Sequence, residues 1–132
     1  MFTELEKNPR TKRVVLVHRN ELFCEALALL LEWKTEFKET VQAGSFAEAR
    51  QALDGPEGKA DLAIVDLDLP EWHGHEPIGD LLGESDVPVL ALTTSQDSEW
   101  RDKASEAGAG EVFNTTVSAA EIISAVRRLG GE

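Results

Sequence analysis

The sequence predicts an α/β protein, a single doubly wound domain built on a parallel sheet. Short, continuously apolar segments occur at 14–17, 62–65 and 87–92, as expected for strands that are buried on both faces. Segments with helical periodicity alternate with them, which is typical of successive β-α units. With 132 residues, the chain is long enough for one domain that buries about two-thirds of its unfolded surface.

The first β-α unit follows a polar segment. We expect residues 1–12 to form a flexible lead-in and residues 13–132 to form the domain. VVLV (14–17) is predicted as the first strand, and a helix is predicted over 20–33. An apolar row at helical spacing predicts the buried face of this helix: Leu22, Ala26, Leu30 and Trp33.

The second unit is less apolar than the first. TVQA (40–43) is predicted as a weaker strand. Ser45 and Glu48 have the spacing of a capping box, which predicts a helix ending near Leu53. The following segment, 54–59, is rich in turn-forming residues and is expected to be a loop.

Three further units complete the chain. The third strand ends at Asp66 and precedes a short helix that ends near Leu82. The fourth strand (87–92) ends at Thr93, and a helix from about Asp97 to Ala107 follows it. A short strand at 112–113 then leads to a last helix, opened by Ser118 and Glu121 as a second capping box.

The strength of each strand suggests its place in the sheet. The first, third and fourth strands are continuously apolar and should be central, whereas the second and fifth should lie at the edges. The flavodoxin-like strand order 2-1-3-4-5 satisfies this assignment. We therefore expect a single (βα)5 domain with a five-stranded parallel sheet of that order.

Charge and composition exclude several classes of function. The net charge of −12 repels phosphate backbones, so we expect no direct contact with nucleic acid. No apolar stretch approaches the ~20 residues of a membrane span, and the charged N-terminal segment is unlike a signal peptide. We therefore expect a soluble, cytoplasmic protein without membrane contact. The single cysteine, Cys24, is expected to be a small buried apolar side chain.

Two segments carry a resemblance to a known family. DLAIVDLDLP (61–70), followed by Gly74, is an apolar strand that ends in Asp and is followed by Leu-Pro and a nearby Gly. VPVLALTT (87–94) is an apolar strand that ends in a hydroxyl residue. Both resemble segments of response-regulator receiver domains, which are CheY-like proteins. The resemblance implies that Asp66 is equivalent to the phosphoacceptor and that Thr93 is equivalent to the hydroxyl residue that contacts the phosphoryl group.

The resemblance covers about residues 13–129. EAGAGEVFNT (106–115) resembles the stretch that leads into the fifth strand, and NELFCEALALLLE (20–32) looks like receivers of helix-turn-helix transcription regulators. By this resemblance, Thr93 and Val112 occupy the two switch positions of the family. The fourth helix, fifth strand and fifth helix would form the surface for partners, including a homodimer.

Three positions depart from the family pattern. The acidic pair that binds Mg²⁺ in receivers is replaced by His18 and Arg19, the lysine after the fifth strand is Thr115, and the aromatic switch residue is Val112. Mg²⁺ requires hard oxygen ligands in an octahedral arrangement. We therefore expect weak or lost Mg²⁺ binding, no other resident metal, and slow or absent phosphorylation of Asp66. Arg19 is positively charged and could neutralise Asp66 in place of a metal.

The interpretation is an atypical receiver, or pseudo-receiver, of two-component signal transduction that works through protein–protein contacts and not as an enzyme. One alternative is a conventional receiver, phosphorylated on Asp66 by a histidine kinase in a phosphorelay. A second alternative is a module that binds a small ligand or a transition metal at the strand ends. These readings concern the same pocket residues: His18, Arg19, Asp66, Asp68, Thr93 and Thr115.

Several side chains near this pocket have an ordinary structural interpretation as well. Asp68 is expected to face solvent, and Asp66 could simply cap the loop after its strand. His18, His73 and His75, together with a carboxylate, suit zinc or another transition metal, although solvent-exposed loop histidines are more common. Trp72 is expected beside the pocket, and Trp100 either packs onto the sheet or anchors a partner.

Overall fold

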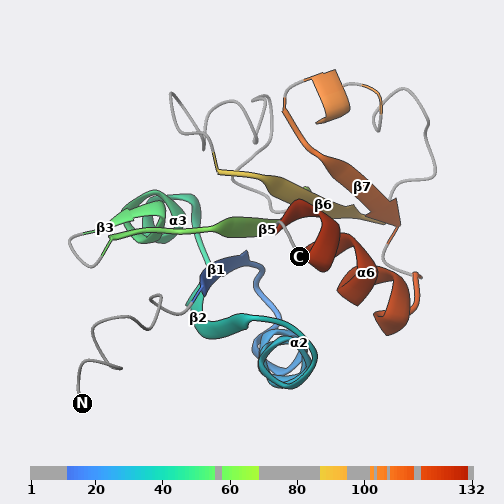
Figure 1. Cartoon of the computed structure of the whole chain (residues 1–132). Coiled ribbons are helices and arrows are strands. Elements are labelled where there is room, and N and C mark those ends of the chain that lie inside the picture. The colour runs from blue at the N-terminus through green and yellow to red at the C-terminus, as the bar shows by residue number, and fades with distance from the viewer. Residues whose placement is uncertain are drawn as a thin grey trace, which may run out of the picture.

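A computed structural model describes the chain over residues 12–55, 58–68, 87–94, 102, 104–106, 108–114 and 117–130. Within these residues, five parallel strands form a sheet of order β2-β1-β5-β6-β7 (Figure 1). Numbered among the five alone, this is the order 2-1-3-4-5, so the predicted fold is confirmed. The five strands are β1 (Lys12–Val17), β2 (Phe37–Ala43), β5 (Leu62–Asp66), β6 (Val89–Thr93) and β7 (Glu111–Asn114).

Three helices are described from end to end, together with a small hairpin: α2 (Glu21–Lys34), α3 (Phe46–Leu53), α6 (Ala119–Leu129), and the antiparallel pair β3 (Asp54–Gly55) and β4 (Gly58–Lys59). Each helix begins at a side-chain cap. The Asn20 side chain accepts a hydrogen bond from the Phe23 amide, and Ser118 accepts one from Glu121. Ser45 accepts one from Glu48 in the same way. The two predicted serine caps therefore do open helices, and the hairpin lies in the segment predicted as a loop.

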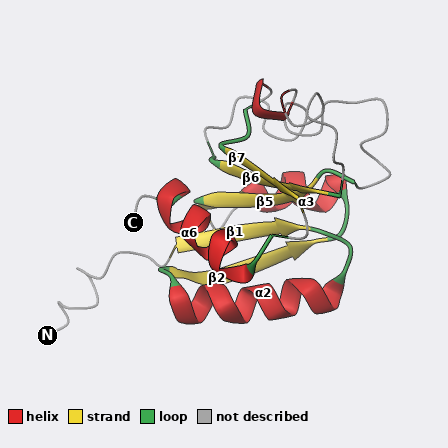
Figure 2. Cartoon of the chain, turned by 90° about the vertical axis from the view of Figure 1, so that its right-hand side faces the viewer, coloured by secondary structure: helices red, strands yellow, loops and turns green. Residues whose placement is uncertain are grey.

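The helices cover both faces of the sheet (Figure 2). Alternate residues of β1 belong to two separate apolar clusters: Val15 and Val17 lie in the cluster that includes α3, and Val14 and Leu16 in the one that includes α2 and α6. All four are at most 1% exposed. Burial on both faces explains why the central strands are continuously apolar.

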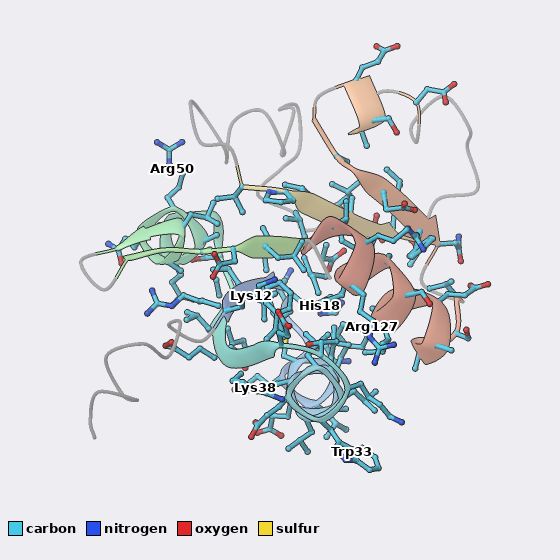
Figure 3. The ribbon with its side chains drawn as sticks, viewed as in Figure 1. Lys12, His18, Trp33, Lys38, Arg50 and Arg127 are labelled. Atoms are coloured by element: carbon cyan, nitrogen blue, oxygen red, sulfur yellow. The ribbon has the colours of Figure 1, made fainter. Side chains whose placement is uncertain are left out.

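The prediction for the buried face of α2 was wrong except for Leu30, which is partly buried against the apolar cluster that includes α2 and α6. The residues that pack on the sheet are Cys24, Leu27 and Leu31, whereas Leu22 is 75% exposed and Trp33 is 77% exposed. Figure 3 shows Trp33 pointing away from the body of the molecule. The helix carries apolar rows on opposite sides, so periodicity alone could not select the row that is buried.

Phe37 and Ala43, the two ends of β2, are fully buried, and the strand is three residues longer than predicted at its start. It pairs with β1 from Lys12 onward, so backbone hydrogen bonding extends it through the polar residues between.

The start of β1 is held against the end of α6. Lys12 Nζ donates a hydrogen bond to the Gly130 carbonyl and lies 3.1 Å from Glu36 Oε1. Arg127 of α6 donates to the Lys34 carbonyl at the end of α2. These contacts fix the two helices on the same face at the end of the sheet remote from the strand carboxyl ends.

Several predicted features lie outside the described residues: the helix ending near Leu82, Trp72, His73, His75, Trp100, Thr115 and the lead-in up to residue 11. Of the helix predicted over 97–107, residues 102 and 104–106 are described, and they are helical. The described helices include none with the length and apolar character needed to span a bilayer.

Candidate functional site

Three polar side chains meet at the carboxyl ends of the central strands. His18 directly follows β1, Asp66 ends β5, and Thr93 ends β6. Since β5 lies between β1 and β6, the sheet order itself brings these residues together. Ligand sites of open α/β sheets lie at this edge.

His18 faces Asp66 across the strand ends. His18 Nε2 lies 3.7 Å from Asp66 Oδ2, and the two side chains are 19% and 14% exposed. The imidazole stacks on Phe23 with 4.5 Å between ring centroids. The Asn20 amide donates a 3.0 Å hydrogen bond to His18 Nδ1. This bond makes Nδ1 the acceptor, so in the neutral ring the proton lies on Nε2, toward the carboxylate.

Burial raises the pKa of Asp66, because the charged carboxylate loses contact with water. The hydrogen bond that the Asp68 amide donates to Asp66 Oδ1, at 2.9 Å, opposes this increase, as does the attraction of His18. The negative charge of Asp68 raises the pKa further, and Arg19 lowers it. The site therefore disfavours the negative charge of Asp66, and the Asp68 amide, His18 and Arg19 partly compensate for this.

Asp68 was predicted to face solvent, but its carboxylate is hydrogen-bonded to the neighbouring strand. Although the residue is exposed, its carboxylate turns back toward the neighbouring strand. Oδ1 accepts a 2.9 Å hydrogen bond from the Thr93 hydroxyl, and Oδ2 accepts a 2.7 Å bond from the Thr94 amide. Asp68 lies in the turn that follows β5, where its amide bonds Asp66 Oδ1, so the alternation of side chains along a strand could not predict its direction.

The other predicted site residues have more varied positions. Arg19 is exposed, and its positive charge lowers the pKa of Asp66, while His18 lies within ion-pair distance of the same carboxylate. Val112 is 9% exposed in β7, beside Ala91 of β6, so the residue that the resemblance places at a switch position is a buried apolar one. Thr115 lies outside the described residues. Sequence reasoning did not identify Phe23 and Asn20, which orient His18; the N-cap character of Asn20 was the available signal.

Cys24 lies beneath the site and is buried, as predicted. Its Sγ is 3.8 Å from the His18 carbonyl. Burial and the nearby negative charges of Asp66 and Glu21 raise the pKa of the thiol to about 11. Next to this region, an open, polar hollow of about 450 Å³ is lined by Arg19, Glu21, Gln42, Gly44 and Glu48.

The fold agrees with comparison to known proteins. Residues 14–127 match the family model described as the response regulator receiver domain. The chain belongs to this family. It is therefore a receiver domain of two-component signal transduction, and members of the family are signalling modules.

The receiver has relatives among curated proteins. It is 32% identical over 119 residues to the DNA-binding transcriptional activator DevR/DosR of Mycobacterium tuberculosis, covering 89% of this chain and 54% of that protein. It is 35% identical to the sensory transduction protein RegX3 of Mycolicibacterium smegmatis, covering 86% of this chain and 48% of that protein. The chain thus spans about half the length of these relatives.

Solved receivers have the same fold. The non-phosphorylated HemR receiver domain from Leptospira biflexa superposes with a TM-score of 0.77 at 27% identity, covering 92% of this chain and 95% of that one. A LuxR-family response regulator from Aurantimonas sp. gives a TM-score of 0.78 at 25% identity, with 92% and 86% covered.

The described residues do not fit the carboxylate set that the family pattern would offer Mg²⁺. Among them, no group of three or more His, Cys, Asp or Glu side chains is placed to hold a metal ion. The position that would supply the acidic pair holds His18 and Arg19, and His18 Nε2 points at Asp66. Mg²⁺ prefers oxygen ligands, and a histidine–carboxylate pair of this kind offers too few.

Proposed function

We propose that this receiver acts through protein–protein contacts in a signalling pathway, without phosphorylation of Asp66. The observation that carries the proposal is the pairing of His18 Nε2 with Asp66 Oδ2 at 3.7 Å. A histidine thereby takes the place in which the family pattern would have metal-binding carboxylates. Phosphoryl transfer depends on positive charge that stabilises the transferring group, and much of it comes from the metal.

The proposal predicts weak or absent Mg²⁺ binding. A cationic or neutral imidazole cannot replace a carboxylate as a magnesium ligand, and Arg19 adds a repulsive positive charge. The loss of the usual lysine at Thr115 removes a further positive group from the phosphoryl site. Signal output then depends on which partner binds the domain, not on the phosphorylation state of the pocket.

A candidate contact surface lies at the edge strand β7 and helix α6. It has a hollow of about 370 Å³, lined by Phe113, Ala120, Glu121, Ser124 and Arg128. Arg128 forms a 3.0 Å ion pair with Glu111 at this surface. Receivers use this surface for partners and dimers, so we propose it for a protein partner or a second copy of the chain.

DNA contact is not part of the proposed role of this domain. Relatives carry names such as DNA-binding transcriptional activator and KDP operon transcriptional regulatory protein, but the chain covers about half or less of their lengths. The net charge of −12 opposes direct DNA binding. We propose that any effect on transcription passes through another domain or a separate protein.

The test is a two-dimensional amide NMR titration with Mg²⁺, followed by beryllofluoride, an analogue of the phosphoryl group. For the native chain, we expect no saturable shift of the Asp66, Leu67 and Thr94 amides. The double variant His18→Asp/Arg19→Asp restores two carboxylates and should bind Mg²⁺ saturably. The matched control His18→Asn/Arg19→Asn removes the same native side chains without adding carboxylates, and should not bind.

Saturable Mg²⁺ and beryllofluoride shifts in the native chain would overturn the proposal. They would favour the conventional alternative, in which a histidine kinase is the phosphate source for Asp66. In that case, the next experiment is phosphorylation by acetyl phosphate with and without Mg²⁺, with Asp66→Asn as the control.

A further inference from the structure

The hydrogen bonds of Asp68 indicate a function that the family resemblance does not assign to this residue. Two donors from the end of β6 converge on its carboxylate, the Thr93 hydroxyl at 2.9 Å and the Thr94 amide at 2.7 Å. Each donor contacts a different oxygen, so the carboxylate is bound at both of its acceptor atoms. An anion held by a hydroxyl and a backbone amide is a common arrangement in anion sites.

The geometry fixes this arrangement from both sides. Thr93 is fully buried at the end of β6, so its backbone and side chain are held in place. Asp68 is held at its other end, because its amide donates a 2.9 Å hydrogen bond to Asp66 Oδ1. The Leu67 amide also donates to the Leu92 carbonyl, which joins the loop to β6. The carboxylate therefore closes a loop between β5 and β6.

We propose that Asp68 is an internal ligand of an anion site formed by the Thr93 hydroxyl and the Thr94 amide. The carboxylate occupies the donors that a tetrahedral oxyanion, such as phosphate or sulfate, would use, and its charge repels such an anion. Removing the carboxylate opens the site to an external oxyanion. This inference deepens the proposed function, since it gives a second reason why the pocket does not respond to a phosphoryl group.

The two carboxylates near the strand ends affect phosphoryl chemistry in different ways. Asp66 is paired with His18 where the family pattern would have metal-binding carboxylates, so under the proposed function the metal that assists phosphoryl transfer is not bound. Asp68 acts at the opposite side of the pocket, on the hydroxyl and amide donors. Restoring carboxylates at positions 18 and 19 therefore leaves the Thr93 and Thr94 donors occupied.

The test uses the full chain without metal. Inorganic phosphate and, separately, sulfate are titrated at constant ionic strength, and amide NMR follows Thr94. In Asp68→Ala, we expect saturable shifts of the Thr94 amide and affinity at least about tenfold tighter than in the native chain. Glu25→Ala, which removes an equal charge from the exposed outer part of α2, should behave as the native chain does.

Two further variants identify the donors and guard against misfolding. Asp68→Ala/Thr93→Val keeps the opened site but lacks the hydroxyl, and should lose most of the gained affinity. Asp68→Asn keeps the side-chain size without its charge; if Asp68→Ala does not fold, this variant should still bind phosphate more tightly than the native chain.

The proposal is overturned if the folded Asp68 variants show no saturable shift at Thr94, or if the native chain binds the anions as tightly as they do. It is also overturned if Thr93→Val leaves the gained affinity unchanged. These outcomes are independent of Mg²⁺ binding by the native chain. Failure of this inference and failure of the proposed function are therefore separate results.

Discussion

Gly130, just after α6, lies against the ring of Phe37 at the start of β2. A Cβ atom built on Gly130 would lie 2.6 Å from Phe37 Cε2 and 2.9 Å from the Val126 carbonyl oxygen. Both neighbours are fixed, since Phe37 is fully buried and the carbonyl belongs to α6. The glycine thus permits a close approach between the last helix and the edge strand.

Gly130→Ala should therefore destabilise the domain by about 1–3 kcal/mol, because an added methyl overpacks the contact with Phe37. Urea unfolding followed by circular dichroism measures the change. Gly44→Ala is the matched control, since its Cβ would meet no atom closer than 3.8 Å. Equal effects of the two substitutions would show that the Phe37 contact is not the cause.

The opposite sides of α2 should respond very differently to substitution. Leu31 is fully buried, so Leu31→Ala should cost about 2–5 kcal/mol. Trp33 is largely exposed and stacks under Lys34 Nζ at 4.7 Å from the ring centroid, so Trp33→Gln should change stability by less than about 1 kcal/mol. Chemical denaturation distinguishes the two. A large loss for Trp33→Gln would contradict the packing of α2.

The pH dependence of the free energy of unfolding should show that burial disfavours the charged form of Asp66. Its folded-state pKa is raised above that of the unfolded chain, so the native state binds more protons between the two values. The free energy of unfolding contributed by this group therefore falls as pH rises through that window. Asp66→Asn should be more stable than the native chain at pH 7, with a smaller difference near pH 4.

Urea unfolding at several pH values checks this sign. The exposed Glu25→Gln is the control for general loss of negative charge, and its difference from the native chain should depend less on pH. A destabilising effect of Asp66→Asn that is larger at pH 7 than near pH 4 would mean that the charged carboxylate is favoured in the fold, contrary to the prediction.

Cys24 should react slowly while the domain is folded. The thiol is buried, and with a pKa of about 11 it is largely protonated at pH 8. We expect alkylation by iodoacetamide at pH 8 to be on the order of 100-fold slower than in guanidinium chloride. Because the chain has one cysteine, intact mass measures the reaction directly. Comparable rates in the two conditions would contradict the burial.

The fold could be predicted from the sequence because strands that are buried on both faces are apolar at every position. Residues 14–17 and 62–65 are apolar without alternation, and this pattern identifies the central strands. The face of α2 was not predictable in this way, since Leu22 and Leu27 belong to apolar rows on opposite sides of one helix. Only the docking of the helix selects between them.

The site was predictable in part for a similar reason. Asp66 and Thr93 end apolar strands, so the sheet order alone brings them to one edge. The direction of the Asp68 carboxylate depends on the loop that follows β5, and the orientation of His18 depends on hydrogen bonding by Asn20. Both are three-dimensional relationships between side chains and backbone, and neither leaves a periodic signal in the sequence.

The hydrogen bond between Lys12 and Gly130 brings together the first and last residues that the structure describes. His18 is at the far end of β1, six residues or roughly 20 Å away along the strand. A fluorophore or affinity tag fused to either end of the chain is therefore connected to the described fold at the end of the sheet remote from the pocket, and Lys12 and Gly130 keep their native contacts. Immobilising the protein through such a tag leaves the strand carboxyl ends open, which suits surface-based screens for partners and for small anions.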